Sequence, residues 1–146
     1  MTIRQYIAVV SVLGSLFMLG CQESISTTET VPVAGKITYG GGEWPRPATI
    51  SFVVEEAAAG MPLNSGSAEL APDGIFKAST FAPNDGLVPG KYLINLECWE
   101  SNPADSPTPP ASLIPEKYRR GMNSGFRVEV PAGKTPVRVE FDVPKP

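Results

Sequence analysis

The sequence predicts an all-β domain, a Greek-key sandwich of seven strands, behind an N-terminal signal helix. Two observations carry the prediction of β structure. The 14 Gly and 16 Pro residues are too many for long helices, and apolar and polar residues alternate in short segments that turn residues separate. A hydrophobic fraction of 42% is too high for a disordered chain, and 146 residues suit one domain. We therefore expect one β-sandwich with appendages.

The first element is an export signal at residues 1–20. Arg4 precedes an apolar stretch of about 14 residues, whereas a membrane span needs about 20, so this segment is expected to be removed. The motif Met18-Leu19-Gly20-Cys21 ends it and resembles the lipobox of bacterial lipoproteins. In that motif small residues precede a cysteine that receives diacylglycerol, and the resemblance implies lipidation of Cys21. The alternatives are an incidental cysteine behind a plain signal peptide and an uncleaved anchor.

Residues 21–30 are the second element, a polar segment without hydrophobic periodicity that is expected to be a flexible, disordered tether. A lipid on Cys21 would attach the domain to a membrane, where it faces the periplasm or the cell surface. Stable attachment of this kind needs more than one acyl chain, and a bacterial lipoprotein carries two or three. We therefore expect a cell-envelope protein whose first partner is the membrane and whose folded domain covers residues 31–146.

Seven segments of the domain combine strand-forming residues with turn signals at either side. They are residues 31–39, 48–55, 65–70, 75–80, 91–99, 125–131 and 136–143. The last two segments alternate most regularly, and we expect them to pair as a hairpin across residues 132–135. Asp73-Gly74 predicts a second tight hairpin, between the third and fourth segments, because Gly accepts a positive φ. No segment of the domain is predicted to be helical.

Two residues of the fifth strand have predicted structural roles. Tyr92 follows the turn Val88-Pro89-Gly90, so its hydroxyl can return to the backbone upstream, as in the tyrosine corner of Greek-key sandwiches. Cys98 lies on the more apolar face of the strand and is expected to be buried. Because the chain has no histidine to act as its base, Cys98 is interpreted as an inert core thiol.

Short turn and strand motifs follow one another from residue 31 to residue 143. They are Val33-Ala34-Gly35-Lys36-Ile37, Gly41, Pro45, Ile50-Ser51-Phe52, Pro72-Asp73-Gly74-Ile75-Phe76, Asn84-Asp85-Gly86-Leu87-Val88-Pro89-Gly90-Lys91-Tyr92, Ile114-Pro115-Glu116-Lys117-Tyr118 and Asn123-Ser124-Gly125-Phe126. In this order they resemble small bacterial lipoproteins with a carboxypeptidase regulatory-like domain. The resemblance implies a transthyretin-like (prealbumin-like) sandwich and a non-catalytic, extracytoplasmic accessory role, with no catalytic residues to carry over.

The composition excludes several kinds of chemistry. The absence of histidine rules out His-based triads, His proton shuttles and His-containing metal sites. The segment Tyr118-Arg119-Arg120-Gly121 is similar to the C-terminal signature of transthyretin-like hydroxyisourate hydrolases, but those enzymes need histidines and end at that signature. Glu55-Glu56, Asp73 and Asn84-Asp85 lack the pattern of a calcium loop and are interpreted as turn and surface residues. We expect no enzyme activity, cofactor or metal.

Two function classes remain for the domain. The net charge of −3, with both signs interspersed, argues against nucleic acid. The leading prediction is a structural or protein-interaction module that uses loop 100–123 or the tryptophans as contacts. The Pro-rich first half of this loop is expected to be mobile and its second half to be anchored. The alternative is a carbohydrate- or small-ligand-binding module with exposed Trp44 and Trp99 as its aromatic platform. Against it, Trp99 could be covered by the returning loop and Trp44 could cap one end of the sandwich.

Overall fold

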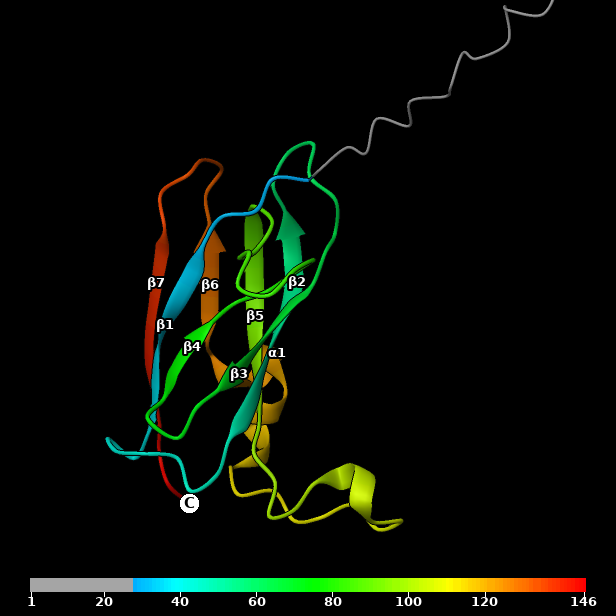
Figure 1. The fold of residues 1–146 in the computed structure, drawn as a ribbon, viewed down its shortest axis with the longest axis vertical. Coiled ribbons are helices and arrows are strands. Elements are labelled where there is room, and N and C mark those ends of the chain that lie inside the picture. Colours follow the sequence, from blue (N-terminus) through cyan, green and yellow to red (C-terminus); the bar gives the residue numbers. More distant parts are fainter. Residues whose placement is uncertain (1–27) are drawn as a thin grey trace, which may run out of the picture.

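The computed structural model describes residues 28–146, which form two β-sheets packed face to face (Figure 1). The predicted signal segment, Cys21 and most of the predicted tether lie outside the described residues. Lipidation of Cys21 therefore stays a prediction. Within the described part of the chain, no helix combines the length and the apolar character that a membrane crossing requires.

All seven predicted strands are confirmed in the described residues, with bounds that differ by a few residues. They are β1 (Val33–Tyr39), β2 (Ala48–Ala57), β3 (Gly66–Leu70), β4 (Ile75–Lys77), β5 (Gly90–Glu97), β6 (Arg127–Val130) and β7 (Val137–Val143). The shortest, β4, ends at Lys77 rather than at residue 80. The period-2 pattern located these strands because one side of each faces the core.

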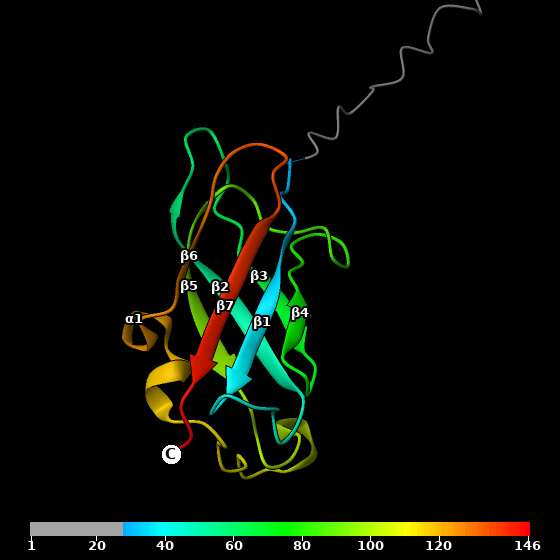
Figure 2. The ribbon, with the colours of Figure 1, turned by 90° about the vertical axis from the view of Figure 1, so that its left-hand side faces the viewer.

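The smaller sheet has the order β4-β1-β7, and the larger has the order β3-β2-β5-β6. β1 and β7 are parallel along their whole length, from Val33 opposite Val137 to Tyr39 opposite Val143. Figure 2 shows these two strands side by side and pointing the same way. All the other pairs of strands in the two sheets are antiparallel. The first and last strands of the domain are thus hydrogen-bonded neighbours.

The core lies between the two sheets and is built from the inward residues of each strand. Ile50 and Phe52 of β2 and Ile94 and Leu96 of β5 are fully buried. Phe52 meets Phe76 of β4 across the core, with ring centroids 6.0 Å apart. Burying one such side chain contributes about 1.5–3 kcal/mol, so this alternating set supplies the main stabilisation of the fold.

The predicted hairpin of the last two strands is wrong. β6 pairs with β5 in the larger sheet, whereas β7 pairs with β1 in the smaller sheet. Their apolar residues face each other across the core, where Val130 and Val139 are both buried. The connection at 131–136 therefore crosses between sheets. An alternating pattern fixes which face of a strand is buried, but it does not fix the neighbouring strand.

The predicted turn at Asp73-Gly74 forms, but the hairpin does not extend along β3 and β4. The Asp73 carboxylate accepts a hydrogen bond from the Ile75 backbone N–H at 3.0 Å, and Gly74 has a φ of 82°. β4 then pairs with β1 instead of β3. A bridge between Ser67 and Ser79 is what joins the two sheets along this edge.

The predicted loop 100–123 contains short helical turns that the sequence analysis missed: η2 (Pro103–Asp105), η3 (Glu116–Arg119) and the single turn α1 (Gly121–Ser124). The second half is anchored, as predicted, because Ile114 and Tyr118 are buried. The Gly121 backbone N–H donates to the Asn95 side chain on β5. Residues 100–111, here called the arm, are almost entirely exposed, and the predicted mobility of this half is not tested.

Three aromatic rings connect the edges of the two sheets where β6 and β7 are not hydrogen-bonded. Phe126 stands before β6 and Phe141 lies in β7, and their ring centroids are 4.5 Å apart. Tyr118 of η3 stacks on the other side of Phe126, at 5.3 Å. Stacked rings of this kind contribute about 0.5–1.5 kcal/mol beyond the free energy gained from burying their area. They therefore stabilise the side of the sandwich where β6 and β7 form no hydrogen bonds with each other.

Candidate functional site

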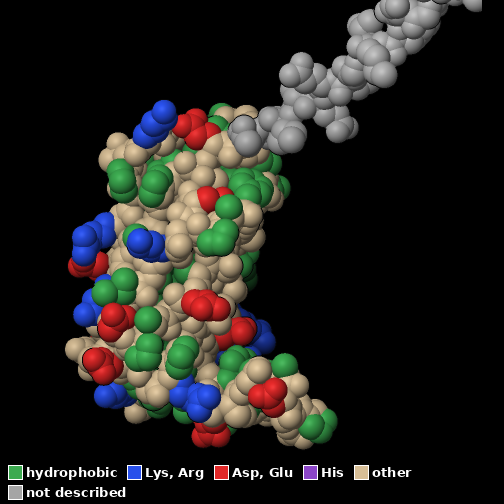
Figure 3. Space-filling view, in the orientation of Figure 1, with side chains coloured by type: hydrophobic (Ala, Val, Ile, Leu, Met, Phe, Trp, Pro, Cys, Tyr) green, Lys and Arg blue, Asp and Glu red, His purple; other side chains and the backbone are tan. Residues whose placement is uncertain are grey.

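The two ends of the sandwich are formed by different segments of the chain. Residue 28, where the described chain begins, lies at the same end as the loop 131–136 (Figure 1). The arm, the loop 40–47 and the C-terminus lie at the opposite end, here called the arm end. Figure 3 shows the arm projecting from the body, with the surface hollowed where the two meet. The arm end therefore carries a projection and a hollow on the face seen in this view.

Short antiparallel pairing closes the base of the arm. Trp99 and Ser112 form a bridge, the Glu100 N–H donates to the Ala111 carbonyl at 3.0 Å, and the Leu113 N–H donates to the Cys98 carbonyl at 2.8 Å. The two ends of the arm are thus held together directly beyond β5. A loop closed in this way has a fixed origin on the sandwich even though its residues face solvent.

Trp99 stands at the base of the arm and is half-buried. The guanidinium of Arg119 lies 4.4 Å from the centre of its ring, which is a cation–π contact. The indole N–H donates to the Glu97 carboxylate at 3.4 Å. The returning half of the loop therefore covers part of Trp99 and leaves the rest exposed.

Trp44 is in a different environment. Its side chain is only 3% exposed, and the indole N–H donates to the Ile37 carbonyl at 2.6 Å. The ring packs against Tyr39, with centroids 5.4 Å apart. Trp44 closes one end of the core and offers no ring face to a ligand, so it drops out of the candidate binding residues.

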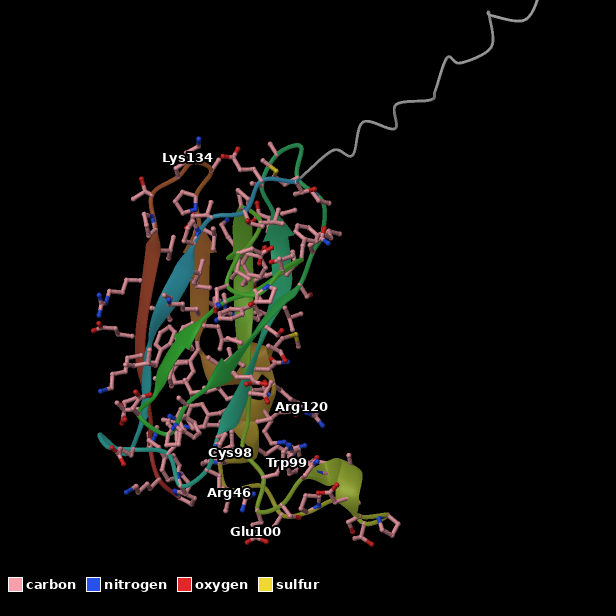
Figure 4. The ribbon with its side chains drawn as sticks, viewed as in Figure 1. Arg46, Cys98, Trp99, Glu100, Arg120 and Lys134 are labelled. Atoms are coloured by element: carbon pink, nitrogen blue, oxygen red, sulfur yellow. The ribbon has the colours of Figure 1, made fainter. Side chains whose placement is uncertain are left out.

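A small pocket of about 240 Å³ lies beside the exposed part of Trp99. Its side chains come from the loop before β2, from β2, from the end of β5 and from the arm, and they include Arg46, Thr49, Glu97, Trp99, Ser101 and Asn102. In Figure 4, Arg46, Trp99 and Glu100 gather at the arm end, whereas Lys134 lies at the opposite end. The pocket joins residues that are far apart in the sequence around one aromatic ring.

The charged side chains that line this pocket form none of the ion pairs found in the described residues. The ion pairs of the described residues are Lys91–Glu56, Arg120–Glu116, Arg127–Glu55 and Arg138–Glu140, all on the surface. Exposed pairs contribute about 0–1 kcal/mol each. Arg46 and Glu97, which line the pocket, belong to none of them. The Arg46 guanidinium can thus donate to another molecule, and the Glu97 carboxylate, which accepts from the Trp99 indole, has further acceptor sites.

A larger recess, about 590 Å³, lies between the edge strands β3 and β4. Its polar lining includes Ser67, Glu69 and Lys77. The aromatic side chain at this recess, Phe76, is buried in the core and offers no stacking surface. The recess is the larger hollow, but the pocket at Trp99 has a partly exposed aromatic ring in its lining.

Tyr92 has the role that the sequence predicted. Its side chain is 1% exposed, and its hydroxyl donates to the Val88 carbonyl at 2.5 Å. The Asn64 carbonyl lies 3.3 Å from the same hydroxyl. Burial raises the pKa of Tyr92, so the group stays protonated as a hydrogen-bond donor.

Cys98 is also placed as predicted. It is a free thiol, 1% exposed, with its sulfur 3.8 Å from the Arg46 carbonyl. Burial raises the pKa of the thiol, and the opposing effects of Arg46 are smaller. A protonated thiol out of contact with solvent is a poor nucleophile, so Cys98 belongs to the core.

The acidic residues considered as calcium ligands have other roles in the described residues. Asp85 accepts hydrogen bonds from the backbone N–H groups of Thr80, Phe81 and Ala82 at 2.7–3.0 Å. Glu55 and Glu56 form surface ion pairs. Within residues 28–146, no group of three or more Cys, Asp or Glu side chains is placed to hold a metal ion.

Comparison with known protein families finds no matching family, and comparison with curated proteins finds no match either. The candidate site therefore rests on its own geometry. Sequence reasoning named Trp99 but missed its neighbours Arg46, Glu97 and Arg119. The position of Glu97 beside Trp99 could have been predicted, because residues i and i+2 of a strand lie on the same face. Arg46, from the loop before β2, lines the same pocket as Trp99, and Arg119, from η3, contacts the Trp99 ring; periodicity encodes neither placement.

Proposed function

We propose that the chain is a lipid-anchored, non-catalytic, extracytoplasmic module with a structural or interaction role, and that the arm end is its contact surface. In this proposal Cys21 carries the lipid, residues 21–30 are the tether, and the sandwich stands on a membrane facing the periplasm or the cell surface. The envelope component that it contacts is a protein or a glycan.

The observation that carries this proposal is the separation of the two ends of the sandwich. The described chain enters at the end opposite the arm (Figure 1). A lipid joined to that entry point leaves the arm, the pocket at Trp99 and the loop 40–47 as the surface farther from the attachment point. Binding residues are commonly held on loops that a rigid scaffold positions, and the two sheets supply that scaffold here.

A non-catalytic role fits the reactive groups that the chain has. The sequence contains no histidine, and the free thiol of the described residues, Cys98, is buried. Activation of a nucleophile commonly uses a neighbouring base or a strongly lowered pKa, and burial raises the pKa of Cys98.

We further propose that the domain is a Greek-key sandwich of the transthyretin-like type and related to carboxypeptidase regulatory-like domains. The division into sheets of three and four strands supports this, as does the tyrosine corner formed by Tyr92 and Val88. Gly35, in the first resembling motif, packs directly against the backbone of Val139. A glycine at this point of the motif supports the close pairing of β1 with β7.

The anchor is tested with the cell-expressed protein beside its Cys21→Ser variant. Intact mass and detergent-phase partitioning are measured for both. We expect the wild type to lack residues 1–20, to carry acyl mass and to enter the detergent phase, and the variant to do none of these. Equal behaviour of the two proteins would remove the anchor from the proposal.

The contact surface is tested by placing a photo-activated benzophenone amino acid at Ala104, in the arm, or at Lys134, in the loop at the opposite end. Both positions are exposed. Irradiation of intact cells should give a discrete adduct of an envelope component from position 104 and none of that size from position 134. Adducts that are the same at both positions would contradict a contact surface at the arm end.

A further inference from the structure

We propose that the pocket at the base of the arm binds one pyranose ring of a neutral saccharide, with Trp99 as the stacking surface. This inference deepens the proposed function, since it names the ligand class taken by the arm end. The pocket is formed by Arg46, Glu97, Trp99 and Asn102, with Thr49 and Ser101 at its walls.

The aromatic surface of the pocket is held in place before any ligand arrives. Arg119 lies against the Trp99 ring, and the Trp99–Ser112 bridge fixes the backbone. Arg119 does not line the pocket, so the guanidinium and the pocket use different parts of the indole. The C–H groups of a sugar ring are apolar and pack on an aromatic face, while its hydroxyls point to the rim. A fixed indole with one open part suits that geometry at low entropic cost.

The polar walls supply both kinds of hydrogen-bonding partner that a sugar hydroxyl uses. Arg46 brings guanidinium donors, and Glu97 brings carboxylate acceptors. Glu97 already accepts from the Trp99 indole, which orients its carboxylate. The Asn102 side-chain oxygen accepts from the Ala104 N–H at 3.1 Å, so its amide NH₂ is left to donate. Each sugar hydroxyl can both donate and accept a hydrogen bond, so two neighbouring hydroxyls can bind a planar guanidinium, carboxylate or amide group.

The balance of charge favours a neutral ligand over an anionic one. One guanidinium, Arg46, and one carboxylate, Glu97, line the pocket and offset each other. A uronic acid or phosphate placed here would meet the Glu97 carboxylate as well as the guanidinium. The volume, about 240 Å³, lies below the range of about 300–1,000 Å³ that drug-sized ligands occupy, so it suits a single ring of a longer chain.

The experiment uses the mature lipidated protein in a zwitterionic detergent, because maltoside and glucoside detergents would compete for the pocket. Calorimetric titration with cello-, chito-, malto- and laminari-oligosaccharides should detect binding of at least one. Glu97→Gln and Trp99→Phe should each weaken that binding about tenfold or more, since they remove a charge-assisted acceptor and part of the stacking surface. Glu69→Gln, on the exposed face of β3, is the matched control and should bind as the wild type does.

Two results would overturn the saccharide assignment: no member of the panel binds, or binding survives Glu97→Gln, Trp99→Phe and Arg46→Gln unchanged. Thermal unfolding of each variant shows that a loss of binding is not a loss of fold. The cross-linking experiment separates this failure from failure of the proposed function. An adduct at position 104 without saccharide binding keeps the contact surface and removes the sugar, whereas saccharide binding by a protein without acyl mass removes the anchor alone.

Discussion

The Tyr92 hydroxyl holds the start of β5 to the turn that precedes it. It donates to the Val88 carbonyl in the turn before β5, and the Asn64 carbonyl lies nearby. Tyr92→Phe keeps the ring and leaves the Val88 carbonyl without this partner, so we expect the free energy of unfolding to fall by about 1–2 kcal/mol. Urea denaturation followed by circular dichroism measures it. A midpoint equal to that of the wild type would contradict the tyrosine corner.

Asp85 makes the stability of the domain depend on pH. Partial burial acts to raise the pKa of Asp85, but hydrogen bonds from the Thr80, Phe81 and Ala82 backbone N–H groups outweigh it, and the pKa lies below its ordinary value of 3.8. The ionised form is favoured in the folded state. Its contribution is therefore present above pH 3.8 and is lost as the pH falls through the lower, folded-state pKa.

The test compares urea unfolding of the wild type and Asp85→Asn from about pH 6 to about pH 2. The variant should be less stable than the wild type at pH 6, and the difference should shrink as the pH falls. Asp105→Asn, in the exposed arm, serves as the control and should follow the wild type. A difference that stays constant across this range would show that Asp85 does not titrate as stated.

At the scale of the elements, the close approach of β1 and β7 depends on Gly35. A Cβ atom added there would lie 1.8 Å from the Val139 carbonyl oxygen, which is a severe overlap with backbone. We expect Gly35→Ala to lower the free energy of unfolding by about 1–3 kcal/mol or more, because the two strands must move apart. Gly42→Ala is the control, since its Cβ would meet nothing closer than the Tyr39 carbonyl at 3.9 Å. Equal loss of stability in both variants would contradict this account.

The strands themselves were predictable from the sequence, but several of their neighbours were not. Alternation located β6 and β7 because it records burial, yet it placed them in one hairpin, whereas the structure places them in different sheets. The turn at Asp73-Gly74 was identified from local chemistry, which does not determine that β4 joins β1. The alternation of apolar and polar residues also predicted that Cys98 is buried. It did not predict the burial of Trp44, because the turn that holds Trp44 folds back onto Ile37.

At the scale of the whole molecule, Cys98 reports on opening of the sandwich. Its thiol lies beneath the base of the arm and is 1% exposed. In the Cys21→Ser variant it is the remaining cysteine of the chain. We expect iodoacetamide to modify it in proportion to the globally unfolded fraction as urea is raised, because the buried, protonated thiol does not react in the folded state. Mass spectrometry after a short pulse measures this, and modification well before the unfolding transition would show that the arm opens separately.

The parallel pairing of β1 with β7 has a consequence for when the domain can fold. A chain that emerges from a ribosome or a translocon with its N-terminus first presents β1 long before β7. The central strand of the smaller sheet, β1, then lacks one neighbour until β7 arrives, and pairing over so long a sequence distance is slow. For a protein exported as proposed here, this delay is useful, since a chain that stays unfolded passes through the membrane and completes its sheets only on the far side.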